Sequence, residues 1–226
     1  MPPPRISTGL TDLIGQTGLY VPSWIRQFYA SLFVDLHHNF IHFAFRGRDY
    51  RLTSQRVREI LMLQEQPVKL HEVYYGQTEP PRRPHGGLVP PIDLVRHYFK
   101  EPFGEGSRRN PSDLTLTAQV LEAIMRRTLL PRMGYREGLT RIQLWLLNAL
   151  MQQTVFDIWD LLLSEMEDTI AEGFKGHRQL PYAHWITFII LKAVTVRSPE
   201  MVAEYRGATT EFPAYNMAQR IRHSTP

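Results

Sequence analysis

The sequence contains no cysteine among its 226 residues. This absence excludes disulfide bonds, thiolate zinc sites, iron–sulfur clusters and cysteine nucleophiles. An apolar stretch is also missing near the first residues, which read Met-Pro-Pro-Pro-Arg, so no signal peptide is predicted. We therefore expect an intracellular protein, nuclear or cytoplasmic, that is not secreted.

Long uninterrupted hydrophobic runs are absent as well. The longest apolar stretch with helical character covers residues 142–163, but Asp157 and Asp160 are among the polar residues that interrupt it. Its length would span a bilayer, yet a carboxylate in the middle of a membrane costs about 3 kcal/mol. We therefore expect a buried helix of a soluble protein here and no membrane contact.

An excess of charge of one sign is missing too. The chain has 26 lysine and arginine residues against 22 aspartate and glutamate residues, a formal net charge of +4. Hydrophobic residues make up 43% of the sequence. A chain of this size buries roughly 70–75% of its unfolded surface. Disorder over most of the length is therefore excluded, and the charge alone does not require binding to nucleic acid.

Hydrophobic periodicity predicts a mainly α fold with one small β-hairpin near the N-terminus, a minor α+β component. The hairpin strands are predicted at residues 39–45 and 50–52, and Gly47 in the turn tolerates a positive φ. Helices are predicted over residues 22–33, 54–63, 92–99, 114–130, 140–172, 181–196 and 199–205. In the longest of these helices, residues 152–155 are the candidate position for one break.

These elements predict a single compact helical domain over residues 21–206. Residues 1–20 are expected to form a flexible N-terminal arm and residues 207–226 an irregular C-terminal tail. Proline, arginine and glycine residues predict an exposed loop at about 64–91. Apolar spacing assigns one shared core to Trp24, Phe28, Leu32, Phe43, Leu61, Leu144, Trp145, Leu147, Ile158, Leu162, Trp185, Phe188 and Ile189.

Catalytic constellations are not evident. A metal-dependent nuclease needs three carboxylates around its metal ions, and here the acids cluster on the predicted helix at 140–172. Asp157 and Asp160 lie one turn apart, a spacing typical of the solvated side of an amphipathic helix. His38 and His42 are predicted on one side of a strand without a third ligand. We expect no catalytic residue, no metal site and no cofactor, and we favour a protein that is not an enzyme.

Arginines provide the candidate binding residues. They surround the predicted hairpin and recur in two separate loops, so the fold could bring some of them together against phosphate groups or an acidic partner. The alternative is ordinary ion pairing with nearby acids such as Asp49, Glu59 or those around Glu165. The candidates are Arg46, Arg48, Arg51, Arg56, Arg82, Arg83, Arg108 and Arg109.

Four short segments resemble the plant transposon protein domain family. Residues 24–32 (WIRQFYASL) are similar to its opening VREFYANL pattern, and residues 43–48 (FAFRGR) to the extended stretch that ends in RG. Residues 57–63 and 180–187 are similar to its later helical patterns. The resemblance covers roughly residues 20–200 and implies an open reading frame derived from a plant transposon or retrotransposon. It carries no catalytic residues.

The sequence thus favours a non-catalytic module that binds a protein or a nucleic acid. One alternative is a Gag-like structural protein that self-associates, and another is a metal-dependent transposase or nuclease. The missing zinc knuckle disfavours the first alternative, and the distribution of acids disfavours the second. The identity of the partner stays open at this point.

Overall fold

The computed structural model describes residues 19–70 without 36 and 38, and residues 92–101, 110–130, 138–171 and 180–208. Most of the predicted arm, loop and tail therefore lies outside the described residues. The chain divides into two compact units, one formed by Met1–Pro67 with Asp157–Pro213, the other by Val68–Phe156 with Ala214–Pro226. The prediction of a single compact domain is not confirmed, and each unit is described separately.

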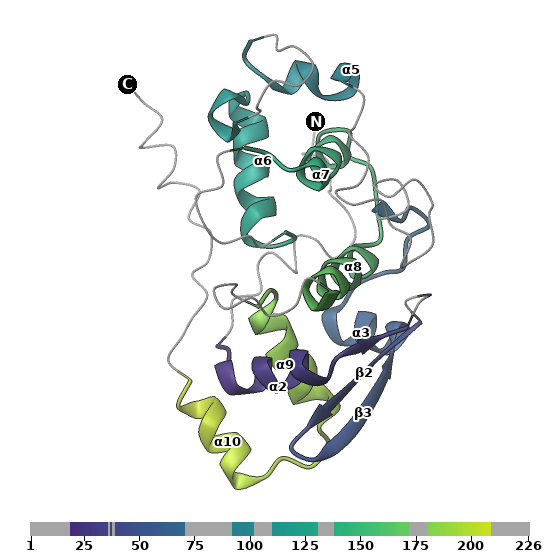
Figure 1. Ribbon diagram of the computed structural model, residues 1–226, viewed down its shortest axis with the longest axis vertical. Coiled ribbons are helices and arrows are strands. Elements are labelled where there is room, and N and C mark those ends of the chain that lie inside the picture. Colours follow the sequence, from purple (N-terminus) through teal and green to yellow (C-terminus); the bar gives the residue numbers. More distant parts are fainter. Residues whose placement is uncertain are drawn as a thin grey trace, which may run out of the picture. The chain divides into compact units, whose positions relative to one another are not determined.

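The first unit combines helices with a small antiparallel sheet (Figure 1). Its helices are α2 (Pro22–Ser31), α3 (Ser54–Leu61), α8 (Ile158–Ala171), α9 (Ala183–Ala193) and α10 (Pro199–Arg206). Its strands are β1 (Phe33–Val34), β2 (Phe40–Phe45) and β3 (Arg48–Thr53), in the order β1-β2-β3. The predicted mixture of helices with a hairpin near the N-terminus is therefore confirmed for this part of the chain.

Local sequence signals fix where these helices begin. Pro22 occupies the first turn of α2, where its missing N–H costs nothing. The side chain of Thr53 accepts a hydrogen bond from the Arg56 amide and caps α3. Ser198 caps α10 in the same way.

The predicted hairpin is present, with a two-residue turn between β2 and β3. Arg46 and Gly47 both have a positive φ, of 50° and 72°. Positive φ at both central residues is the mark of a type I′ turn, whose twist matches that of the two strands. The register pairs Phe45 with Arg48 and continues to Phe40 opposite Thr53.

Strand β1 was not predicted. Phe33 was expected at the end of the first helix, but it pairs with His42 in an antiparallel strand. The backbone of Leu32 is extended (φ −64°, ψ 125°), which ends α2 before Phe33. The two-residue strand is too short to show the alternation that identifies strands in a sequence.

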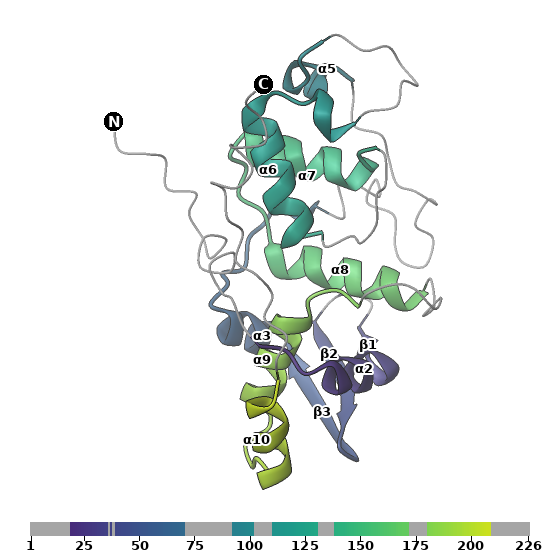
Figure 2. The same ribbon diagram turned by 90° about the vertical axis from the view of Figure 1, so that its left-hand side faces the viewer.

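The inner face of the sheet packs on α2 and forms the core of this unit. The rings of Phe28 and Phe43 lie 4.8 Å apart, and Trp24 meets Phe45 edge-on at 5.5 Å. Helix α9 packs against α2 and α3, as both views show (Figure 1, Figure 2). Every predicted core residue is buried except Trp145 and Phe188, which are partly exposed.

The second unit is helical in its described part. Its elements are α5 (Ile92–Val95), the 3₁₀ turns Arg96–Tyr98 and Pro111–Asp113, α6 (Leu116–Arg127) and α7 (Arg141–Met151). Leu144 and Leu147 belong to its own cluster, which also contains Val95, Tyr98, Phe99, Leu114 and Ala118. They are therefore assigned to this cluster, whereas the sequence predicted one core for the whole chain.

The long helix predicted over residues 140–172 is two helices, α7 and α8. Thr140 caps α7 through a reciprocal hydrogen-bonded box with Gln143. The candidate break is confirmed, because α7 ends at Met151 and Gln153 has a φ of 54°. Within the described ranges, no helix has both the length and the apolar character needed to cross a membrane.

Candidate nucleic-acid interface

The outer face of the sheet carries a row of aromatic and basic side chains. Residues of β2 alternate, with Ile41, Phe43 and Phe45 buried, so Phe40 and His42 point away from the core. The register places Phe33 of β1, His42 of β2 and Arg51 of β3 in one line across this face. We call Phe33, Phe40, His42 and Arg51 the outer-face cluster.

The planar groups of the cluster lie close to one another. The ring centroids of Phe33 and Phe40 lie 6.2 Å apart with an interplanar angle of 39°. The guanidinium carbon of Arg51 lies 3.8 Å from the centroid of the Phe40 ring, within the range of a cation–π interaction. Phe33, Phe40 and Arg51 therefore form a continuous series of planar groups.

The cluster is accessible to solvent. Phe33 is 55% exposed, although a phenylalanine ring is among the most apolar side chains. Arg51 is exposed, and Phe40 and His42 are partly exposed. The outer face thus presents π surface that the described residues leave uncovered.

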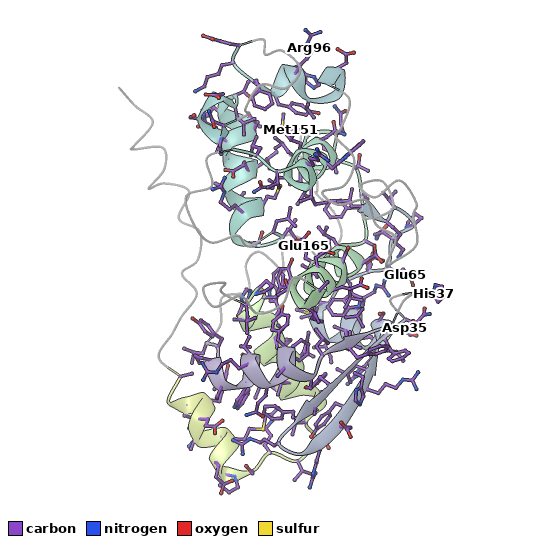
Figure 3. The ribbon with its side chains drawn as sticks, viewed as in Figure 1. Asp35, His37, Glu65, Arg96, Met151 and Glu165 are labelled. Atoms are coloured by element: carbon purple, nitrogen blue, oxygen red, sulfur yellow. The ribbon has the colours of Figure 1, made fainter. Side chains whose placement is uncertain are left out.

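Charges on the outer face nearly balance. The Nε2 atom of His42 lies 3.5 Å from the Oδ1 atom of the exposed Asp49. Asp35, in the β1–β2 connection, accepts hydrogen bonds from the amides of His37 and Asn39 at 3.3 Å each. Figure 3 shows Asp35 and His37 at this end of the sheet. The outer-face cluster therefore offers one full positive charge, on Arg51, beside polar groups that can accept or donate hydrogen bonds.

The structure separates the predicted arginines of the hairpin. Arg51 belongs to the outer-face cluster. Arg48 is also exposed, but it pairs in register with the buried Phe45 and thus projects from the opposite side of β3. Cross-strand partners share a face of a sheet. These two arginines therefore cannot form one patch on one face.

Two further predicted arginines take part in ion pairs, which is the alternative that the sequence left open. The Nη2 atom of Arg46 lies 2.8 Å from the Oε1 atom of Glu204 in α10. Glu204 was not among the predicted partners. The Nη1 atom of Arg56 lies 2.9 Å from the Oε2 atom of Glu59, which is one of the predicted partners. Arg82, Arg83, Arg108 and Arg109 lie outside the described residues.

Glu204 connects the hairpin turn to the core. It accepts a hydrogen bond from the indole of Trp24, which is fully buried, and it pairs with Arg46 at the turn. The hydrogen bond from Trp24, followed by the interactions with Arg46, holds the pKa of Glu204 below its usual value. This contact fixes α10 and the hairpin tip to each other.

The two acids singled out in the sequence are buried, so the expectation of a solvated helix face is wrong for them. Asp157 is fully buried, and its Oδ2 atom lies 2.7 Å from a guanidinium nitrogen of Arg58. It also accepts hydrogen bonds from the amides of Gln66 and Asp160. Asp157 therefore holds α3, the following segment and the start of α8 together, which is a structural role.

Metal-ligating residues do not gather in the part of the chain that the structure describes. No group of three or more histidine, aspartate or glutamate side chains there could hold an ion. His42 belongs to the outer-face cluster, and His38 and His177 lie outside the described residues. His184 sits on α9, where burial lowers its pKa from 6.5 to about 4.

Comparison with known proteins adds no assignment. No protein-family model, curated protein or solved structure matches this chain. The resemblance to the plant transposon family stays a prediction.

Sequence reasoning missed the two phenylalanines of the outer-face cluster as functional candidates. In β2 both alternating sets of residues are largely apolar, so the sequence alone does not show which set faces solvent. Phe33 was assigned to a helix face. A usable signal was the row of charged or polar residues in β3, Asp49, Arg51 and Thr53, which marks the exposed face of its neighbours.

Proposed function

We propose that this chain is a non-catalytic binding module whose outer-face cluster binds single-stranded nucleic acid. The observation that carries the proposal is the exposed series of Phe33, Phe40 and Arg51 on one face of an antiparallel sheet. It favours the nucleic-acid alternative over the unspecified protein partner.

Stacking supports a nucleic acid as the ligand. Every base has a π-face, and a base stacked on an aromatic side chain contributes about 1–3 kcal/mol of binding energy. The second face of an arginine guanidinium is also a stacking surface for a base. Phe33 and Arg51, at the two ends of the series, would each receive one base.

Exposed stacking surfaces favour single strands over duplexes. Bases in a duplex are stacked on each other and are reached only at their edges, through the grooves. The exposed rings of the outer-face cluster match the faces of bases, which a duplex keeps stacked on each other. Unpaired bases can turn toward the rings, while Asp49 and His42 offer hydrogen-bonding groups to their edges.

The modest charge of the cluster fixes the expected salt dependence. For single strands, log K falls with log [salt] by about 0.7 for each phosphate that is neutralised. Arg51 is the one full positive charge of the cluster, so we expect a shallow slope. Stacking, rather than counterion release, should supply most of the affinity.

An origin in a plant transposable element, which the sequence resemblance implies, belongs to the same proposal. A module without catalytic residues that binds single strands would serve such an element by holding its transcript or an unpaired DNA intermediate. A metal-dependent nuclease is less well supported, because Asp157 is committed to Arg58 and to two backbone amides.

Binding of a fluorescent single-stranded oligonucleotide, measured by anisotropy over a salt series, tests the proposal. Phe33→Ala should weaken binding about 5- to 150-fold, the equivalent of 1–3 kcal/mol. Leu116→Ala is the matched control, since Leu116 is 63% exposed and lies in the other unit. The control should bind as the parent does.

Arg51→Gln and Arg48→Gln make a second matched pair, because both remove one charge from the same strand on opposite faces. Arg51→Gln should weaken binding and make the salt slope shallower by about 0.7, whereas Arg48→Gln should leave both nearly unchanged. Equal effects of the two variants, or a parent protein that binds no single strand at low salt, would overturn the proposal.

A further inference from the structure

Strand β3 is an open edge of the sheet within the described residues. The order β1-β2-β3 leaves one side of β3 without a neighbouring strand. Edge strands present backbone N–H and C=O groups that can pair with another chain.

The hydrogen bonds of β2 show which backbone groups of β3 point to its open side. The carbonyl of Phe40 accepts from the Asp35 amide, and the amide and carbonyl of Ala44 both bond to the Ser31 hydroxyl. Even-numbered residues of β2 thus direct their backbone groups away from β3. Their odd-numbered neighbours bond to β3, and the register makes Arg48, Tyr50 and Leu52 the bonding residues there.

The backbone groups of Asp49, Arg51 and Thr53 therefore point to the open side of β3. The side chains of Asp49 and Arg51 lie on the outer face, two residues apart and of opposite charge. Tyr50 stands between them and points inward, where its ring stacks on Phe43 at 5.5 Å.

This order of charges is complementary to itself. When two copies of β3 run antiparallel with Tyr50 opposite Tyr50, Asp49 of each copy lies opposite Arg51 of the other. Asp49 and Arg51 are also among the residues whose backbone groups point to the open side of β3, so each such pair can exchange both N–H···O bonds. Charge pattern and hydrogen-bond pattern thus select the same register.

We propose that β3 is a self-association edge, which pairs antiparallel with β3 of a second copy of this chain about Tyr50. The two sheets then join into one, with Asp49–Arg51 pairs on its outer face. Cross-strand pairs of opposite charge stabilise an antiparallel sheet, whereas like charges directly opposite destabilise it. This inference does not depend on nucleic-acid binding.

The competing explanation is that the charges keep the edge free. Charged side chains on an edge strand are a common protection against unwanted pairing. A protective role needs only charge, whatever its order, while the self-association edge needs this order. Reversing or equalising the charges therefore separates the two explanations.

Sedimentation of the purified chain without nucleic acid, over a range of concentrations, provides the test. The parent should show a concentration-dependent dimer. Asp49→Arg and Arg51→Asp should each be monomeric at the same concentrations, since each places like charges opposite each other. An equimolar mixture of these two variants should form a heterodimer, and the double variant D49R/R51D should dimerise again.

Amide hydrogen exchange gives a second readout that needs no variant. The amides of Asp49 and Arg51 should exchange more slowly as concentration rises, whereas the Tyr50 amide, already bonded to β2, should not respond. A parent that stays monomeric throughout, or single variants that dimerise as well as the parent, would overturn the proposal. If a variant fails to fold, as a thermal melt would show, the exchange of the parent decides alone.

Discussion

Arg58 and Asp157 lie 99 positions apart in the sequence, yet their charged groups meet at 2.7 Å in the interior of the first unit. Asp157 is fully buried, and the side chain of Arg58 is 12% exposed. Such a pair gains little over an apolar pair of the same volume, but leaving one partner alone is costly. The pair therefore specifies how α3 meets the start of α8.

Removing the arginine alone should be strongly destabilising. Arg58→Met leaves the buried Asp157 without its cation, and we expect a loss of about 3–5 kcal/mol in the free energy of unfolding. The double variant R58M/D157N should recover part of this loss, because asparagine removes the uncompensated charge and keeps a side-chain oxygen that can accept from a backbone amide. Urea denaturation of the four proteins of this cycle measures the coupling, and additive losses would contradict it.

Burial predicts the cost of truncating the aromatic core. Phe28 is fully buried and Trp185 is 1% exposed, so Phe28→Ala and Trp185→Ala should each cost about 3–5 kcal/mol. Val196→Ala, at a position that is 74% exposed, serves as the control. Thermal melts of the core variants that coincide with the melt of the parent would show that the core assignment is wrong.

Glu204 should matter more for stability than its neighbour on the same helix. Glu204→Ala leaves the indole N–H of the buried Trp24 without its acceptor, and we expect a loss of about 1–3 kcal/mol. Glu200→Ala, one turn earlier in α10, should have a smaller effect.

The Glu204 contribution has a defined pH window. Because the folded-state pKa of Glu204 is lowered, its stabilising contribution is present above the usual glutamate pKa and is lost as the pH falls through the lowered value. The stability difference between the parent and Glu204→Ala should therefore shrink in acid. A difference that stays constant down to pH 2 would contradict this role of the carboxylate.

His184 should make the first unit sensitive to mild acid. Burial lowers its pKa from 6.5 to about 4, so the unfolded chain binds a proton that the folded chain does not. Its contribution is complete above pH 6.5 and should be lost progressively down to about pH 4, by about 3 kcal/mol in all. Denaturation of the parent and His184→Gln at several pH values tests this. Identical pH dependence of the two proteins would exclude His184 as the source.

Much of the fold follows from the sequence, because strong local signals agree with the packing. Apolar residues at helical spacing mark α2 and α3, and Gly47 in the turn suits the positive φ found there. Element bounds then follow to within a few residues.

The candidate site was harder to predict from the sequence, for physical reasons. Asp157 has the spacing of a solvated acid, and only the fold brings Arg58 close enough to bury it. The apolar spacing predicts that Phe33 belongs to a helix. Its exposure instead follows from a strand of two residues, which is too short to show an alternating pattern in the sequence. Long-range pairing and the choice of exposed face are properties of the folded chain.

Photo-crosslinking of a single-stranded oligonucleotide of about 12 nucleotides, substituted with 5-iodouracil, tests the central claim most directly. Trypsin cleaves after Arg26 and Arg46, so one peptide, residues 27–46, contains both Phe33 and Phe40. Mass spectrometry should find the crosslinked nucleotide on this peptide, at Phe33 or Phe40, and Phe33→Ala should reduce its yield while the Leu116→Ala control does not. Crosslinks confined to other peptides, with none on residues 27–46, would contradict binding of nucleic acid by the outer-face cluster.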